Sequence, residues 1–413
     1  MMKTGARTTI LVFGTRGEVQ PLIALGRGLQ AAGHTVTLVT QADFYDFVTE
    51  HGLLCVPIHF DLRQLEKMRS AEGTYGLLGT YKLAKKVARQ ALIEIWEACK
   101  EIDALILGDM GIIPGWHVME KLQVPTYTAH FFPDDICYQI WNRNILNRLG
   151  SLKQDITFTL TSWLILNPFI SEWRKQTLGL PRTSQLKGDL KDYAALGVPM
   201  LHAYSPTVFS KPAEWANADH VTGYWFLDHP ADWSPSAELA TFLAAGPPPV
   251  YVGFGSVSFH DMYQVTDVVL AALAQTGQRG ILAAGWSNLG QRLTFPANIL
   301  AIEGAPHDWL FPQCAAAIHH GGAGTTGIAL RSGIPNLIVP FAFDNPFWAW
   351  RLTELGVSVP AIPPKALTAQ RLAEALNTVL RDATMRARRT EMSRKIQTEE
   401  GVARAIAVFE QYL

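Results

Sequence analysis

The stretch Ala315-Ala-Ala-Ile-His-His-Gly-Gly-Ala-Gly-Thr-Thr-Gly-Ile-Ala-Leu330 places an apolar strand, a glycine-rich turn and a helix in direct succession. Glycines let backbone N–H groups approach a ligand closely, and a helix N-terminus adds about half a positive charge beside them. The stretch therefore predicts an anion site at the carboxyl end of a strand, as in open α/β folds.

Two adjacent histidines stand at the end of this strand. Alternation along a strand sends His319 and His320 to opposite sides, so one of them is expected to be structural, and His320 is the predicted ligand. The other predicted contacts at this helix start are Gly322, Ala323, Gly324 and Thr325, with Thr326 as an alternative hydroxyl. A turn built only for packing is the less favoured interpretation, because so many suitable groups converge on one helix start.

An earlier part of the chain has the same organisation. Residues 9–13 form a short apolar run, a glycine-containing loop follows, and apolar residues recur at helical spacing from Pro21. Residues 35–40 then read as a second strand, so the chain opens with a βαβ unit and a parallel sheet. Gly26 and Gly28 lie inside the predicted helix, where close packing on another element would explain them.

Length and composition indicate two domains. The chain has 413 residues, of which 48% are hydrophobic, more than one core usually organises. Seven prolines and little periodicity between residues 205 and 249 predict the connection, and five further strand candidates follow. They are residues 250–254, 280–284, 299–302, 315–318 and 336–339. We expect an α/β protein with domains at 1–228 and 250–395, a linker at 229–249, and a C-terminal helix at 396–413 that packs back on the first domain.

Charge and cysteine content exclude several classes of protein. The net charge is -1, which gives no electrostatic reason to bind nucleic acid. Four widely spaced cysteines suggest neither a disulfide framework nor a zinc site. With no predicted signal peptide or membrane span, we expect a cytoplasmic location, and the oligomeric state is left open.

Several motifs together resemble a known family. The run from His319 to Thr326, Pro-Phe-Ala-Phe-Asp-Asn-Pro-Phe-Trp at 340–348 and Gly-Thr-Arg-Gly-Glu-Val-Gln-Pro at 14–21 are similar to those of GT-B family 1 glycosyltransferases. Within it, the chain resembles the sterol 3-beta-glucosyltransferase branch and the bacterial antibiotic glycosyltransferases. The match spans nearly the whole chain and includes residues 220–228 and 250–256. The resemblance implies two Rossmann-like domains facing a cleft, the first binding the acceptor and the second the nucleotide sugar.

The resemblance also assigns a catalytic base. Glu18 matches the position of the family's catalytic base, which is His in plant members and usually Asp in the sterol and antibiotic branches. Glutamate at this position is a departure, but it keeps the carboxylate. Such a group at a strand end can accept a hydroxyl proton. Alternatively, Glu18 only stabilises a helix N-terminus. His130, at another strand end, is the rival base, or else a satisfied loop histidine or an acceptor contact.

The same resemblance implies donor contacts. Asp344 aligns with the aspartate that binds sugar hydroxyls, and Asn345 stands where Gln is usual, which puts the exact sugar in doubt. Alternatively, Asp344 caps the helix that begins near Pro346. The other implied donor contacts are Gly17, Ser256 and Trp286. UDP-glucose is the expected donor and dTDP-sugars an alternative. No D-x-D motif is present, so neither a metal nor a cofactor is expected.

The acceptor is expected to be apolar. Residues 127–173 are rich in aromatic and aliphatic side chains, although core packing would look similar. The residues predicted to line the acceptor site are Phe131, Phe132, Asp134 and Trp141. The resemblance favours a sterol or comparable lipid, ahead of polyketide, carotenoid or flavonoid-like molecules. Because such acceptors partition into membranes, transient contact with a membrane surface is expected.

Two other functions fit the sequence less well. A nicotinamide dehydrogenase is disfavoured, because the first loop lacks the third fingerprint glycine and the second strand ends without an acidic residue. A non-catalytic protein that binds a nucleotide sugar or lipid is supported only by the departures at Glu18 and Asn345. An inverting transfer, which the resemblance implies, is therefore the favoured prediction.

Overall fold

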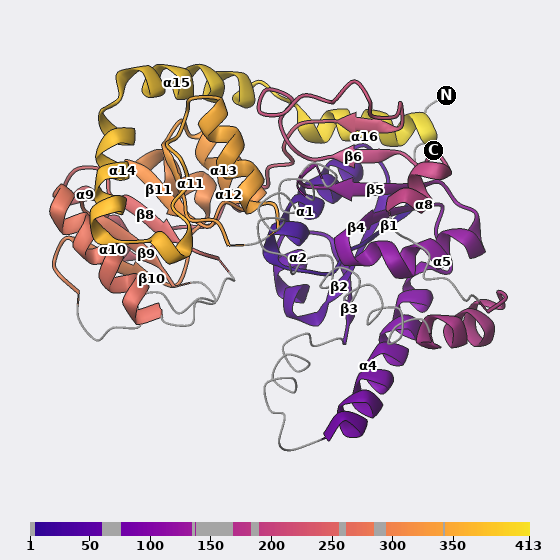
Figure 1. Cartoon of the computed structure of the whole chain (residues 1–413). Coiled ribbons are helices and arrows are strands. Elements are labelled where there is room, and N and C mark those ends of the chain that lie inside the picture. The colour runs from indigo at the N-terminus through magenta and orange to yellow at the C-terminus, as the bar shows by residue number, and fades with distance from the viewer. Residues whose placement is uncertain are drawn as a thin grey trace, which may run out of the picture.

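The computed structural model describes residues 5–59, 76–133, 137, 168–182, 190–255, 262–284, 295–341 and 343–413. Two α/β domains lie side by side in Figure 1, the first in indigo and magenta, the second mostly in orange. Every strand pairing described in either sheet is parallel. The predicted fold class, two Rossmann-like parallel-sheet domains, is confirmed.

The first domain contains a seven-stranded sheet. Its strands, in spatial order, are β3 (Leu54–Ile58), β2 (Thr35–Gln41), β1 (Arg7–Leu11), β4 (Ala104–Gly108), β5 (Thr126–His130), β6 (Met200–His202) and β7 (Asp219–Val221). Its helices are α1 (Arg16–Ala31), α2 (Tyr45–Glu50), α4 (Gly76–Cys99), α5 (Ile112–Leu122) and α8 (Leu190–Ala195). The strand order reverses between β1 and β4, and ligands in open α/β sheets bind at such a point.

Both faces of this sheet are buried, which explains the continuous apolar run near the N-terminus. Ile10 and Val12 belong to the hydrophobic cluster on one face, and Leu11 and Phe13 belong to the cluster on the other. Successive side chains of a strand point to opposite faces, so a strand covered on both sides needs apolar residues at every position.

The second domain contains a five-stranded sheet. Its strands, in spatial order, are β10 (Ile299–Ile302), β9 (Gly280–Ala283), β8 (Val250–Gly253), β11 (Ala316–His319) and β12 (Asn336–Ile338). Its helices are α9 (Ala237–Ala244), α10 (Met262–Thr276), α11 (His307–Leu310), α12 (Ala323–Arg331), α13 (Asn345–Glu354), α14 (Ala369–Arg381) and α15 (Ala383–Gln397). The order reverses between β8 and β11, so the glycine-rich turn after β11 lies at the switch point.

Helix α1 begins earlier than the sequence pattern predicts. It starts at Arg16 because Thr15 and Glu18 form a capping box, and Pro21 lies inside the helix instead of in its first turn. The strands β3, β6 and β7 were also not predicted. The last two have three residues each, too few for alternation to be read from the sequence.

The C-terminal segment forms three helices, α14, α15 and one more. The last, α16 (Gly401–Tyr412), lies on the first domain in Figure 1. A Cβ added at Gly28 of α1 would lie 2.5 Å from Val402 Cγ1, so the glycine permits this close packing. Tyr127 Oη donates a 2.7 Å hydrogen bond to the carbonyl of Phe409. The prediction that the C-terminal helix crosses back to the first domain is confirmed.

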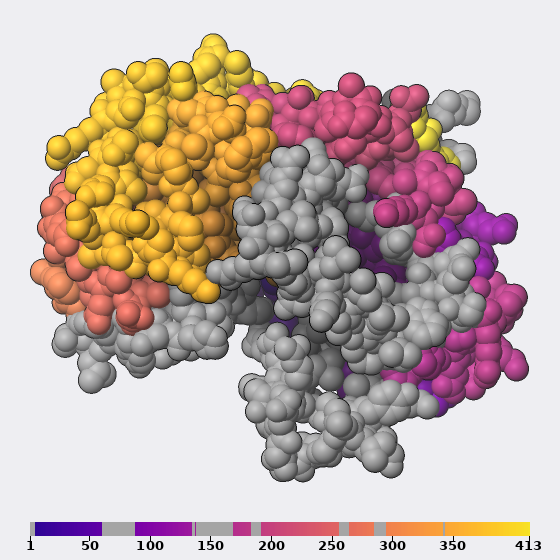
Figure 2. Space-filling model, in the orientation of Figure 1, coloured from indigo at the N-terminus to yellow at the C-terminus, as the bar shows by residue number. Residues whose placement is uncertain are grey.

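Hydrogen bonds stabilise the crossing at the segment between α15 and α16. Glu399 Oε1 accepts hydrogen bonds from Ser205 Oγ at 2.6 Å and Thr207 Oγ1 at 2.8 Å. In Figure 2 the yellow C-terminal chain meets the pink segment that contains these residues. The two hydroxyls thus bind a carboxylate from almost 200 residues later in the chain, which fixes the return of the chain to the first domain.

Replacing Gly401 with alanine should therefore weaken this crossing. The added Cβ would lie 2.3 Å from the carbonyl oxygen of Tyr224, a backbone atom that cannot rotate away. We expect the free energy of unfolding to fall by about 1–3 kcal/mol, the usual cost of overpacking, measured by thermal or urea denaturation. Gly304→Ala is the matched control, because nothing lies within 4 Å of its added Cβ. Equal stability of the two variants would contradict the prediction.

Candidate active site

A glycine-rich turn joins β11 to α12. Gly321 has a φ of +97°, a region that favours glycine, and Gly322 is the N-cap of α12. A Cβ at Gly322 would lie 2.5 Å from His320 Nε2, and no atom lies near the Cβ position of the exposed Gly324. The turn therefore needs Gly321 and Gly322, and it presents the first amides of α12 beside His320, with open space at Gly324.

The first of the two histidines supports the turn. His319 is fully buried, its Nδ1 accepts a 3.1 Å hydrogen bond from the N–H of Gly321, and its Nε2 lies 2.8 Å from Asn336 Oδ1. Burial lowers the pKa of His319 to about 3, so the ring is neutral at pH 7. Both ring nitrogens are occupied within the protein, which identifies His319 as the structural member of the pair.

The second histidine has a ring nitrogen available. His320 Nδ1 is buried and has no hydrogen-bond partner among the described residues. The ring lies against Gly255, whose added Cβ would be 3.2 Å from His320 Cε1. Burial lowers the pKa of His320 to about 4, so it is neutral at pH 7 and offers a single N–H donor. Because buried polar atoms normally have partners, this nitrogen is suited to a ligand.

Asp344 connects the starts of two helices. Its Oδ2 accepts hydrogen bonds from the N–H of Ala323 at 3.1 Å and from Trp348 Nε1 at 2.9 Å. Its Oδ1 accepts a 3.0 Å bond from Asn345 Nδ2, and Asn345 Oδ1 in turn accepts one from the N–H of Phe341 at 3.3 Å. Although Asp344 occupies the N-cap position of α13, its side chain makes no capping bond there. It binds the first amide of α12 instead, and burial raises its pKa to about 7.

Glu18 lies in the first turn of α1. Its Oε2 accepts hydrogen bonds from both the N–H and the Oγ1 of Thr15, each 2.5 Å long. Burial raises the pKa of Glu18, while the bonds from Thr15 oppose that shift. The alternative in which Glu18 stabilises a helix N-terminus is thus realised. The N–H of Gly17 donates to Thr15 Oγ1 at 3.2 Å, so the same cap uses it.

The first turn of α1 faces the second domain. Burial is the main cause of the raised pKa of Asp344, and the negative charge of Glu18 raises it further. Burial is also the main cause of the lowered pKa of His307, in the second domain, and the positive charge of Arg16 lowers it further, to about 4. Helices α1 and α12 are also in contact. The structure therefore brings Glu18 of one domain near Asp344 of the other, at the junction of two sheet switch points.

His130 has a more enclosed position. It is the last residue of β5, it is 5% exposed, and its Nε2 lies 2.8 Å from Thr128 Oγ1. Its ring also lies 5.3 Å from that of His202, which is bonded to Asp219. These neighbours are those of a histidine satisfied within the protein, so Glu18 is the better placed of the two predicted bases.

Two of the predicted acceptor residues can be located. Phe131 is buried in the core of the first domain, with its ring 6.4 Å from that of Trp225, and Phe132 is half-buried against the same cluster. The predicted residues Asp134, Trp141, Ser256 and Trp286 lie outside the described residues.

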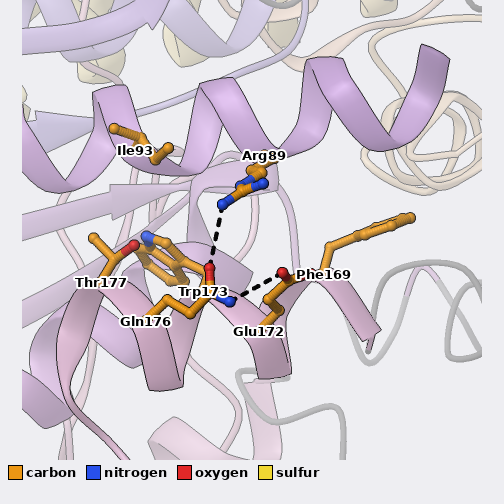
Figure 3. A pocket seen from close by; sticks show the side chains of 7 residues that line it. All are labelled: Arg89, Ile93, Phe169, Glu172, Trp173, Gln176 and Thr177. Atoms are coloured by element: carbon orange, nitrogen blue, oxygen red, sulfur yellow. Dashed lines mark hydrogen bonds between the residues drawn. The ribbon is translucent and has the colours of Figure 1, made fainter. Parts of the chain in front are cut away.

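A small pocket lies between α4 and the helical segment 168–178 (Figure 3). Phe169 and Trp173 form its apolar wall. Arg89 Nη2 donates to Gln176 Oε1 at 3.2 Å, and Gln176 Nε2 donates to Glu172 Oε1 at 3.1 Å, as the dashed lines in Figure 3 show. None of the predicted site residues lines this pocket.

Three supporting residues were missed in the sequence. Thr15 holds Glu18, Trp348 holds Asp344, and Asn336 holds His319. The first could have been found, because Thr-x-x-Glu is the signature of a capping box. Trp348 follows Asp344 by four residues, a helical spacing that would bring the two side chains together. No local signal links Asn336 to His319, since they lie on different strands.

The described residues show neither a cluster of metal ligands nor a membrane-spanning helix. They contain no group of three His, Cys, Asp or Glu side chains that could hold a metal ion. Likewise, no helix within the described ranges is long and apolar enough to cross a membrane.

Two family models match the chain. The glycosyltransferase family 28 N-terminal domain matches residues 8–135, and the erythromycin biosynthesis protein CIII-like C-terminal domain matches residues 267–404. A sterol 3-beta-glucosyltransferase of Arabidopsis thaliana is 33% identical over 98% of this chain and 68% of its own length. A sterol 3-beta-glucosyltransferase of Pichia angusta is 35% identical over 97% of this chain. The chain spans only 26–34% of the length of the fungal relatives.

Solved structures share the fold. The glycotransferase of kitacinnamycin superposes with a TM-score of 0.72 at 20% identity and covers 99% of both chains. The spinosyn forosaminyltransferase superposes with a TM-score of 0.70 at 16% identity, again over 99% of both chains. At these identities the likeness demonstrates the two-domain architecture, and the sequence relationship carries the family assignment.

Proposed function

The chain belongs to the glycosyltransferase family that contains the sterol 3-beta-glucosyltransferases, and from this we propose that it transfers glucose from UDP-glucose to a hydroxyl of a sterol or similar apolar acceptor. The observation that carries the proposal is the contact, across the junction of the two domains, between α1, which bears Glu18 in its first turn, and α12, whose first amide binds Asp344. A base for the acceptor and a carboxylate for the donor sugar must meet in this way for direct transfer.

The proposed reaction is a single displacement. The acceptor oxygen attacks the anomeric carbon while Glu18 accepts the hydroxyl proton, and the bond from that carbon to UDP breaks. UDP leaves with the electron pair, so negative charge develops on its β-phosphate. Attack from the face opposite UDP inverts the anomeric centre and gives a β-linked product from an α-linked donor.

The groups around the glycine-rich turn are suited to the leaving diphosphate. The first amides of α12 and the His320 N–H are fixed donors, and they would stabilise charge that grows in the transition state. We propose that Gly322, Ala323, Gly324 and Thr325 contribute this anion site. The Ala323 amide already donates to Asp344, so its role is to hold that carboxylate beside the diphosphate. The partial positive charge of the helix end and the neutral N–H donor of His320 would stabilise the charge of the diphosphate without a metal ion.

The test of this function is release of UDP from UDP-glucose, with cholesterol in detergent micelles as the acceptor and the product characterised by NMR. We expect turnover that persists in EDTA and a β-anomeric product. A flavonoid acceptor and dTDP-glucose are the matched alternatives. Turnover only with dTDP-glucose would overturn the donor assignment, and an α-linked product would overturn direct displacement. Tight binding of UDP-glucose without turnover against any acceptor would favour a non-catalytic binding protein.

A further inference from the structure

Phe343 has an unusual position for a large apolar residue. Its side chain is 81% exposed, more than any other exposed large hydrophobic residue described. Its backbone has a φ of +52°, in the left-handed region where a phenylalanine is strained and glycine is not. Neither the exposed ring nor the strained backbone helps to form the core. Backbone strain of this kind tends to occur at functional sites.

The two residues that follow Phe343 are held by hydrogen bonds. Asp344 is bound by the Ala323 amide and Trp348 Nε1, and Asn345 is bound by Asp344 and the Phe341 amide. Trp348 itself is fully buried. Phe343 is therefore anchored on its C-terminal side, in the position directly before the carboxylate proposed to bind the donor sugar.

This place is also next to the proposed base. Glu18 lies in the first turn of α1, which contacts α12, and the first amide of α12 donates to Asp344, the residue that follows Phe343 in the chain. An acceptor hydroxyl that reaches Glu18 must bring its attached carbon skeleton to the same side of the second domain. An exposed aromatic ring gains most from a large apolar partner, whereas Asp344, which is 9% exposed, is the deeper group.

We propose that Phe343 binds the acceptor by packing its ring against the apolar skeleton, as a specificity residue contributed by the second domain. The inference rests on the proposed function. It predicts that the acceptor site is completed from both domains, and that an apolar fused-ring acceptor depends on Phe343 more than UDP-glucose does.

The test compares Phe343→Gly with the wild-type protein. Glycine removes the ring and relieves the positive φ, so the melting temperature should be unchanged or raised. We expect KM for cholesterol to rise about tenfold or more, with kcat and KM for UDP-glucose unchanged. Binding of dehydroergosterol, followed by energy transfer from tryptophan, should weaken by a similar factor without any need for turnover. Trp350→Ala, which removes another exposed ring from α13, is the control and should leave both values unchanged.

Each outcome decides the inference. Unchanged dehydroergosterol binding in Phe343→Gly would overturn it, as would a rise in KM for UDP-glucose, which would make Phe343 a donor contact. Equal losses in Trp350→Ala would show a general surface effect and also overturn it. Weakened sterol binding without glucose transfer in the wild type would support Phe343 as an apolar-ligand contact while rejecting the proposed function.

Discussion

Replacing Glu18 with glutamine is expected to lower kcat for glucose transfer by about 10²- to 10⁴-fold, the range usual for a positioned base. The amide oxygen of glutamine can still accept the bonds from Thr15, because a capping box accepts Gln as well as Glu. The start of α1 should therefore persist, while the proton acceptor is lost. UDP release and the melting temperature, measured together, separate loss of chemistry from loss of fold.

The pH dependence of kcat/KM tests whether Glu18 is the base. Glu18 must be ionised to accept a proton, so activity is lost as pH falls through its pKa. Burial raises that pKa above the ordinary value of 4.5, and the hydroxyl of Thr15 opposes the shift. Thr15→Val removes this hydroxyl bond and should move the acidic midpoint of kcat/KM to higher pH. A midpoint that stays in place would assign the titration to another group, such as Asp344.

His130 provides the competing result. In His130→Gln the side chain can still bond to Thr128, and we expect kcat to change little, because His130 is enclosed at the end of β5. If this variant loses a hundredfold or more while Glu18→Gln remains active, His130 is the base and the assignment to Glu18 is wrong.

The two-domain architecture could be predicted because its signals are local. Residues Ala316 to Ile318 are apolar on both faces of the sheet, and Gly321, which follows them, has a positive φ that favours glycine. The sequence also predicted close packing of the helix at Gly28, and the structure identifies α16 as the packing partner. Such features depend on neighbours in sequence or on simple periodicity.

What the sequence could not predict depends on contacts between distant residues. Asp344 was expected to bind sugar or to cap α13, yet it caps α12, because α12 and α13 begin at the same edge of the sheet. Glu18 carries both a capping role and the predicted catalytic role, and only its place near Asp344 distinguishes it from an ordinary helix cap. The exposure and strain of Phe343 likewise follow from its tertiary surroundings.

His320→Ala is expected to lower kcat by about 10²- to 10³-fold, the effect of removing one fixed donor from a developing oxyanion. Gln retains an N–H donor, so His320→Gln should recover part of the activity. His319→Ala is the contrasting variant, since it loses two buried hydrogen bonds and should mainly reduce stability, by about 1–3 kcal/mol. A larger loss of kcat in His319→Ala than in His320→Ala would reverse the roles of the pair.

Stabilisation of the leaving UDP by His320 can be distinguished from binding of the UDP-glucose donor. UDP carries the charge that develops when the sugar leaves, so His320→Ala should weaken binding of UDP more than binding of UDP-glucose. Because burial lowers the pKa of His320 to about 4, the ring should act as a neutral donor. The ratio of wild-type to His320→Ala activity should then stay constant as pH rises through 6.5. A ratio that falls across that range would show that the protonated imidazolium performs the stabilisation, because a cation is lost there and a neutral donor is not.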